Sequence, residues 1–151
     1  MDELQSIAIR LALQDLNARF CHYLDHDRLD QLVDLFADDA VYTHGERRST
    51  GRKAIHALFT VRAAAGVRTT RHLSSGLLLQ IDSESAARGE SICLTFAEDS
   101  APPITPATPY LVADFIDVYR RCADGQWRFA AREIRRIFAA AGNSGPQGAR
   151  R

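Results

Sequence analysis

DELQSIAIRLALQDLNARFCHYL, residues 2–24, opens the chain with a regular spacing of apolar side chains. Apolar residues three and four positions apart line one face of an α-helix, so this spacing predicts one long amphipathic helix. Two shorter helices are predicted after it, over residues 29–36 and from a cap at Ser49 or Thr50 to Gly66. The apolar positions of the first helix are Leu4, Ile7, Ala8, Leu11, Ala12, Leu16, Phe20 and Tyr23.

After Gly66 the pattern changes to β segments. Residues 99–109 contain four of the five prolines and predict a long loop. The last two strands are expected to form a hairpin around Asp124-Gly125, and a kink at Ser75-Gly76 separates the first two. The predicted strands cover residues 67–74, 77–81, 86–96, 110–121 and 126–138, with an earlier one over residues 40–44 after a turn at Asp38-Asp39.

Helices first and antiparallel strands afterwards predict an α+β fold. We expect three N-terminal helices packed on one face of a strongly curved, mixed but mainly antiparallel sheet, which together form a cone-shaped α+β barrel. The mouth of such a cone is suited to binding a small molecule. Residues 1–141 are expected to be a single domain, and residues 142–151 a disordered tail, because they are mostly small or polar.

The composition excludes several classes of function. Nineteen basic residues balance nineteen acidic ones, so neither nucleic acid nor an anionic membrane is an expected partner. No apolar run reaches the ~20 residues of a membrane helix. The acidic start of the chain is unlike a signal peptide. Cys21, Cys93 and Cys122 are odd in number, widely spaced and without a C-x-x-C pattern, which favours free thiols, so a cytoplasmic protein is expected. His22 and His26 have helical i, i+4 spacing but no evident third ligand, so no metal site is predicted.

Two short motifs carry the candidate chemistry: residues 22–27, HYLDHD, at the end of the first helix, and residues 70–73, TRHL, in a predicted strand. A carboxylate can fix the tautomer of an imidazole and stabilise its protonated form, so Asp25 and His72 would form an acid/base pair if the fold brings them together. An aspartate at a helix C-terminus also opposes the helix dipole. The structural alternatives are a solvated Asp25 and a core His72 that binds a neighbouring strand.

In this order of motifs the chain resembles the nuclear transport factor 2-like superfamily, and within it the branch of SnoaL-like polyketide cyclases and scytalone dehydratase. The likeness covers about residues 4–138. The motifs that carry it are Tyr23-Leu24-Asp25, residues 32–41 (LVDLFADDAV), Gly51-Arg52-Lys53-Ala54-Ile55, residues 70–75 (TRHLSS) and residues 124–132 (DGQWRFAAR).

The resemblance implies roles for individual residues. In the eliminating members an aspartate ending the first helix pairs with a histidine in the strand after the third helix, positions held here by Asp25 and His72. An arginine after the last strand's tryptophan, Arg132 here, lines the pocket in several of them. His44 lies near the water-holding tyrosine of scytalone dehydratase. Phe20 stands where other members have a polar tyrosine or lysine, so that group is either missing or supplied from elsewhere, by Tyr42, Tyr110 or His44.

These assignments lead to one hypothesis. His72, oriented by Asp25, removes a proton from a small, largely apolar substrate, while Arg132 and His44 stabilise the developing negative charge. The outcome is a dehydratase-like β-elimination, an isomerisation or a cyclisation. No cofactor is expected, since the sequence lacks a nucleotide-binding glycine motif.

Two alternatives and one association are also predicted. The same fold serves as a non-catalytic ligand-binding or assembly domain, as in dioxygenase small subunits. An epoxide hydrolase would need two aspartates around an arginine, which only Arg132 with Asp114 or Asp117 could supply.

Strict alternation in the last strand puts Arg132 and Phe129 on opposite faces. A homo-oligomer, dimer or trimer, is expected to cover an outer face that carries Trp127, Phe129, Phe115 and Tyr119.

Overall fold

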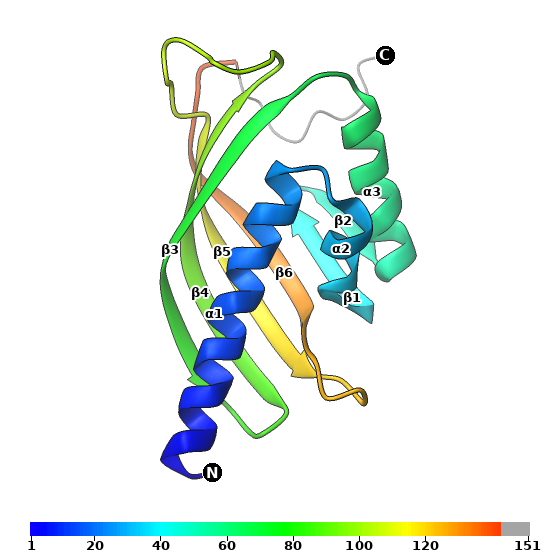
Figure 1. The fold of residues 1–151 in the computed structure, drawn as a ribbon, viewed down its shortest axis with the longest axis vertical. Helices are drawn as coiled ribbons and strands as arrows, with labels where there is room; N and C mark the ends of the chain where they lie inside the picture. Colours follow the sequence, from blue (N-terminus) through cyan, green and yellow to red (C-terminus); the bar gives the residue numbers. More distant parts are fainter. Residues whose placement is uncertain (143–151) are drawn as a thin grey trace.

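The computed structural model describes residues 1–142 and shows helices packed on one curved six-stranded sheet (Figure 1). The sheet order is β2-β1-β6-β5-β4-β3; β1 and β6 are parallel and every other neighbouring pair is antiparallel. This confirms the predicted α+β class with a mixed, mainly antiparallel sheet. The elements are α1 (Glu3–Asp25), α2 (Leu29–Asp34), β1 (Phe36–His44), β2 (Arg47–Thr50), α3 (Arg52–Ala64), β3 (Thr69–Ile81), β4 (Ala86–Glu98), β5 (Leu111–Arg121) and β6 (Trp127–Ala139).

Helix α1 lies across the concave face of the sheet, with α2 and α3 beside it (Figure 1). It begins with a capping box, in which the Asp2 side chain accepts from the Gln5 amide at 2.7 Å and the Gln5 side chain accepts from the Asp2 amide at 2.9 Å. Its buried face packs into an aromatic core. The ring of Phe20 makes edge contacts with Phe36, Phe115 and Phe129 at centroid distances of 6.1, 6.2 and 5.8 Å.

The boundaries predicted around β1 were wrong. The strand begins at Phe36, so Asp38 and Asp39 lie within it as exposed residues rather than in a turn. Its antiparallel partner β2 was not predicted. Ser49 and Thr50 pair with Tyr42 and Val41 in that ladder, and Gly51, not a serine or threonine, is the N-cap of α3. Gly51 has a φ of 86°, a conformation that glycine adopts at little cost.

A β-bulge overturns the alternation predicted for the last strand. The β5–β6 ladder passes from Val118–Ala131 to Tyr119–Phe129, so Ala130 is an extra residue. Phe129 and Arg132, predicted on opposite faces, are therefore both buried in the core. The prediction that β5 and β6 present aromatic side chains on the outer face of the sheet is also wrong. Phe115 and Tyr119 of β5, like Phe129 of β6, are buried in the core.

The remaining predictions agree more closely with the structure. The two predicted segments after Gly66 form one strand, β3, whose ladder shifts between Ser75 and Leu78 around Gly76. The proline-rich loop connects β4 to β5, and the final hairpin turns at Asp124-Gly125 as predicted. Of the predicted tail only Gly142 falls within the described residues. Within residues 1–142, no helix has both the length and the apolar character to cross a membrane.

Candidate active site

The end of α1 and the start of β3 bring Asp25 and His72 into contact. Asp25 Oδ1 lies 2.5 Å from His72 Nδ1, and Asp25 Oδ2 accepts the His72 backbone amide at 2.9 Å. The Thr70 hydroxyl, two residues earlier on the same face of the strand, donates to Asp25 Oδ1 at 2.8 Å. The side chains of His72 and Asp25 are only 9% and 5% exposed. Three hydrogen bonds thus hold the carboxylate away from bulk solvent.

These contacts define the protonation of the pair. Burial alone raises the pKa of Asp25, but the hydrogen bonds from His72 and Thr70 outweigh it and bring the pKa below its usual value. An ionised carboxylate can only accept hydrogen bonds, so His72 Nδ1 carries the proton that lies between them. The other ring nitrogen, Nε2, then has a free lone pair when the ring is neutral. This is the tautomer that a general base needs.

His44, at the end of β1, is the second imidazole of the site. Burial lowers its pKa to about 4, with further lowering by the charges of Arg136, Arg62 and Arg47 and of His72. The His44 ring is therefore neutral at neutral pH. Its Nε2 atom is buried and, among the described residues, has no hydrogen-bond partner. Buried polar atoms are nearly always paired, so this atom is a candidate contact for a ligand.

Because the His44 ring is buried with no partner at Nε2 among the described residues, the free energy of unfolding is expected to depend on pH. Unfolded His44 binds a proton below its ordinary pKa of about 6.5, whereas the folded ring does so only near pH 4. Between these values the unfolded state takes up more protons, so the free energy of unfolding falls as the pH decreases from 6.5 to 4. After discounting for partial exposure we expect a loss of about 1–3 kcal/mol. Urea unfolding at pH 7 and pH 4.5 measures it.

Two variants show how much of the fall in the free energy of unfolding between pH 7 and pH 4.5 is due to His44. His44→Gln should remove the His44 contribution to this fall. His22→Gln, at an exposed position on α1, should show the same fall as wild type. An equal decline in wild type and His44→Gln would contradict the assignment.

Arg132, predicted to line the pocket, lies in a buried polar network. Its Nε and Nη2 donate to the two carboxylate oxygens of Asp117 at 2.8 and 2.7 Å, and Nη2 also donates to Asn17. Asn17 donates to the hydroxyl of Tyr119, which donates to Asp117. The side chains of Arg132 and Asp117 are both 0% exposed. The guanidinium carbon also lies 4.0 to 4.6 Å from the ring centroids of Phe20, Phe115 and Phe129.

Asp117 and Asn17 accept hydrogen bonds from Nε and Nη2 of Arg132, but its Nη1 is buried and has no hydrogen-bond partner among the described residues. Burial lowers the pKa of Arg132, but the Asp117 carboxylate outweighs this and the net pKa is raised, so the guanidinium stays charged. Within the described contacts the second ligand of Arg132 is the amide of Asn17, not a carboxylate. The two-aspartate arrangement of an epoxide hydrolase is therefore not formed around Arg132. Sequence reasoning missed Asn17 because it placed the apolar face of this helix on Leu4, Ile7 and Leu11, which are exposed. The buried face of α1 instead carries Leu13, Asn17 and Phe20.

The other predicted substrate-binding residues differ in position. Phe20 is fully buried in the aromatic core. Tyr42 is also buried, with its ring 5.5 Å from that of Phe59, and burial raises the pKa of its hydroxyl. The ring centroid of Tyr110 lies 5.3 Å from the guanidinium carbon of Arg68. The hydrogen bonds that the Asp25 carboxylate accepts come from His72 and Thr70.

A small hollow of ≈20 Å³ adjoins the dyad on the Asp25 side. It lies between the ends of α1 and α3 and the start of β3, and Asp25, Thr70, Arg62 and Arg68 contribute to its lining. This volume accommodates about one water molecule or one oxygen atom. Arg62 was not proposed from the sequence, although it occupies a position in the apolar stripe of α3 that begins at Ile55.

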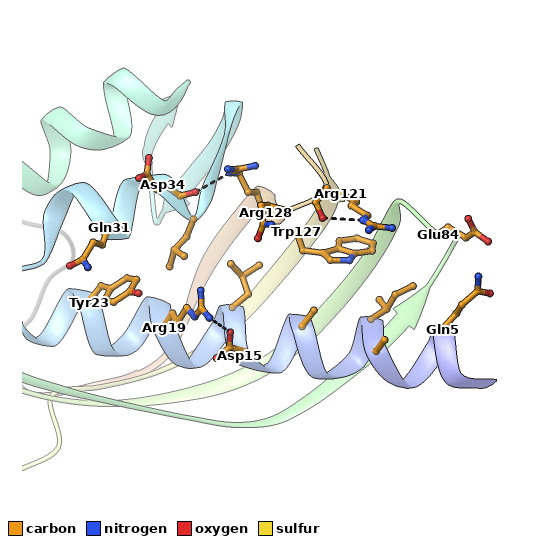
Figure 2. Close-up of a pocket in the computed structure, with 17 residues that line it drawn as sticks. Gln5, Asp15, Arg19, Tyr23, Gln31, Asp34, Glu84, Arg121, Trp127 and Arg128 are labelled. Atoms are coloured by element: carbon orange, nitrogen blue, oxygen red, sulfur yellow. Dashed lines mark hydrogen bonds and ion pairs between the residues drawn. The ribbon is translucent and has the colours of Figure 1, made fainter. Parts of the chain in front are cut away.

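A larger groove of ≈580 Å³ runs along α1 (Figure 2). It shares no lining residue with the hollow beside Asp25. Its rim carries pairs such as Asp15 with Arg19, and Trp127 lies on the side of the β5–β6 hairpin (Figure 2). The Asp15–Arg19 pair on its rim is exposed, and Arg128 is paired with Asp124. The dyad differs from the groove in that its two side chains are buried and in direct contact.

The histidines on α1 face a different environment. The rings of His22 and His26 stack with centroids 4.3 Å apart, and His26 Nδ1 lies 2.8 Å from the His22 carbonyl oxygen. In residues 1–142 there is no group of three or more histidine, cysteine, aspartate or glutamate side chains placed to hold a metal ion.

Comparison with known proteins agrees with this architecture. The model of the SnoaL-like domain family matches residues 5–133. A scytalone dehydratase-like protein from Novosphingobium aromaticivorans is 22% identical, with 90% of this chain and 89% of that one covered and a TM-score of 0.79. LinA is 24% identical over 94% and 96% of the two chains, with a TM-score of 0.77.

A Catenulispora acidiphila protein in complex with S-DNPA is 25% identical over 86% and 94% of the chains, with a TM-score of 0.74. A search of the curated proteins finds no match. Because the family model spans most of the sequence, the chain belongs to the SnoaL-like domain family.

Proposed function

We propose that the protein is a cofactor-independent lyase or isomerase that acts on a small, largely apolar carbon acid, with His72 as the general base. The observation that carries the proposal is the buried Asp25–His72 hydrogen bond, 2.5 Å long. It leaves His72 Nε2 as a base in a site shielded from solvent, which is where such a base is most effective.

In a β-elimination the steps balance without a cofactor. His72 Nε2 takes a proton from carbon, the C–H electron pair forms the new double bond, and the leaving group departs from the neighbouring carbon with its own electron pair. Asp25 stabilises the imidazolium that results. Neutral His44, with its buried and unpaired Nε2, would bind the leaving group or a carbonyl oxygen. Without a leaving group, return of the proton to another carbon gives isomerisation.

Relatives support this class of reaction. One solved neighbour, 22% identical, is described as a hexachlorocyclohexane dehydrochlorinase, which removes a proton and a chloride. Another is a scytalone dehydratase-like protein. Fold alone does not define the reaction. The contribution from this chain is that its own Asp25 and His72 are paired and buried.

Proton abstraction can be tested before the natural substrate is identified. We would incubate the full chain in D₂O with cyclohexanone and 2-tetralone and follow deuterium incorporation by mass spectrometry. Parallel assays would follow chloride release from hexachlorocyclohexane and loss of water from a β-hydroxy ketone. Saturable catalysis of at least one reaction is expected. If none exceeds the rate with free histidine at equal concentration, the proposal fails and a non-catalytic ligand-binding domain is favoured.

A further inference from the structure

Arg62 is a half-buried arginine that lines the hollow beside Asp25 and has no ion-pair partner among the described residues. It lies in the last turn of α3, and its guanidinium makes no hydrogen bond or ion pair with any other described residue. The other arginine of the same hollow, Arg68, pairs with Asp99 at 2.5 Å. Deeper in the core, Arg132 pairs with Asp117 at 2.7 Å. Arginines that are taken out of water are normally paired, so Arg62 is an exception.

The groups around Arg62 do not neutralise it by contact. Burial lowers its pKa, while Asp25 and Asp27 are near enough to act in the opposite direction. Asp25 already accepts three hydrogen bonds from His72 and Thr70, and Asp27 is exposed at the end of α1. The neighbouring Tyr42 is neutral at neutral pH because burial raises the pKa of its hydroxyl. The Arg62 donors therefore remain available to a ligand.

The size of the hollow indicates what those donors could bind. Arg62 lines it together with Asp25 and Thr70, and its ≈20 Å³ has room for about one oxygen atom rather than for a whole substrate. A guanidinium binds the oxygens of a carboxylate or enolate in a planar, two-pronged geometry. Of the alternatives, Phe20 is apolar and packed in the core, and Arg132 already has a carboxylate partner in Asp117, with only its Nη1 unpartnered among the described residues.

The geometry points to Arg62 as the anchor for an anionic oxygen group of the substrate, which makes the substrate a small carboxylic acid or another acid with an oxyanion beside the reacting carbon. This inference rests on the proposed function for its place in the reaction. The binding part can be tested without catalysis. Benzoate and benzamide have nearly the same shape and differ in charge, and neither has a proton on carbon that a general base could remove easily.

We would measure the dissociation constants of benzoate and benzamide for the full chain by NMR titration. Wild type is expected to prefer benzoate by about tenfold, the size of a single charge-assisted interaction. Arg62→Gln should reduce the ratio to about one, and Arg62→Lys should retain part of it, because lysine keeps the charge but loses the planar fork. Arg88→Gln is the control and should keep the full ratio, since Arg88 lies outside the hollow, on β4, and is paired with Asp82.

The outcomes separate the two proposals. A benzoate preference that survives in Arg62→Gln, or that disappears in Arg88→Gln instead, would overturn the assignment of Arg62, as would a wild type with no preference. His72→Gln should keep the preference while losing proton exchange. If His72→Gln exchanges protons as fast as wild type, the dyad proposal fails even when Arg62 binds benzoate. Circular dichroism and melting curves of each variant would establish that it is folded.

Discussion

Replacing His72 with glutamine is expected to slow proton exchange or elimination by about 10²–10⁴-fold, the usual contribution of a positioned general base. Glutamine has about the size of histidine and can still donate a hydrogen bond to Asp25, so the contact between α1 and β3 is kept in part. What it loses is the basic lone pair of Nε2. The rate is measured as deuterium incorporation into 2-tetralone, with kcat and KM determined separately.

Two further variants show whether the effect belongs to the dyad. Asp25→Asn should also slow the reaction, because an amide no longer restricts the His72 proton to Nδ1. The ¹⁵N resonances of the ring report this directly: wild type should show mainly the Nδ1–H tautomer, and Asp25→Asn a mixture. His22→Gln, an exposed histidine on α1, should react at the wild-type rate. Less than a tenfold loss in His72→Gln would remove His72 from the mechanism.

The contact between Asp25 and His72 was expected mainly from the resemblance to the SnoaL-like branch, and the sequence pattern alone only placed each residue in a regular element. Apolar periodicity located the end of α1, and the strand after α3 was evident from its change of period. The order of helices and strands then indicated the sheet class. Their functional roles remain proposals, since the contact alone does not show which reaction follows.

The rest of the site depended on features that the sequence does not mark. The bulge at Ala130 changes the parity of β6 and turns both Phe129 and Arg132 into the core, and alternation along the strand contains no sign of it. Arg62 could not be distinguished from an exposed helix arginine, because the groups that surround it come from β1, β3 and α1, far from it in the sequence. Strand β2 was missed because its sequence, RRST, is polar on both faces.

The buried pair in the core leads to the second large effect. Asp117→Asn is expected to lower the free energy of unfolding by about 3–5 kcal/mol, because it leaves the Arg132 charge buried without a counter-charge. For a chain of this size that corresponds to a fall in Tm of roughly 10 °C or more. The matched control is Asp39→Asn, which makes the same change in an ion pair with Arg120 whose side chains are 72% and 45% exposed. That variant should lose less than about 1 kcal/mol.

The same network also positions the dyad, which gives the prediction a second measurement. Asn17 lies two turns before Asp25 on α1, and its contacts with Arg132 on β6 and Tyr119 on β5 attach that helix to the sheet. The double variant Arg132→Met/Asp117→Leu removes both charges and should regain at least half of the lost stability, since apolar replacement of a buried pair is often neutral. We expect the double variant to exchange protons more slowly than wild type even where its free energy of unfolding is largely restored. The reason is that α1 then loses the hydrogen bond from Arg132 that helps to attach it to the sheet and to position Asp25 against His72. An Asp117→Asn protein within about 1 kcal/mol of wild type would show instead that water reaches Arg132 and that the pair is not sealed in the core.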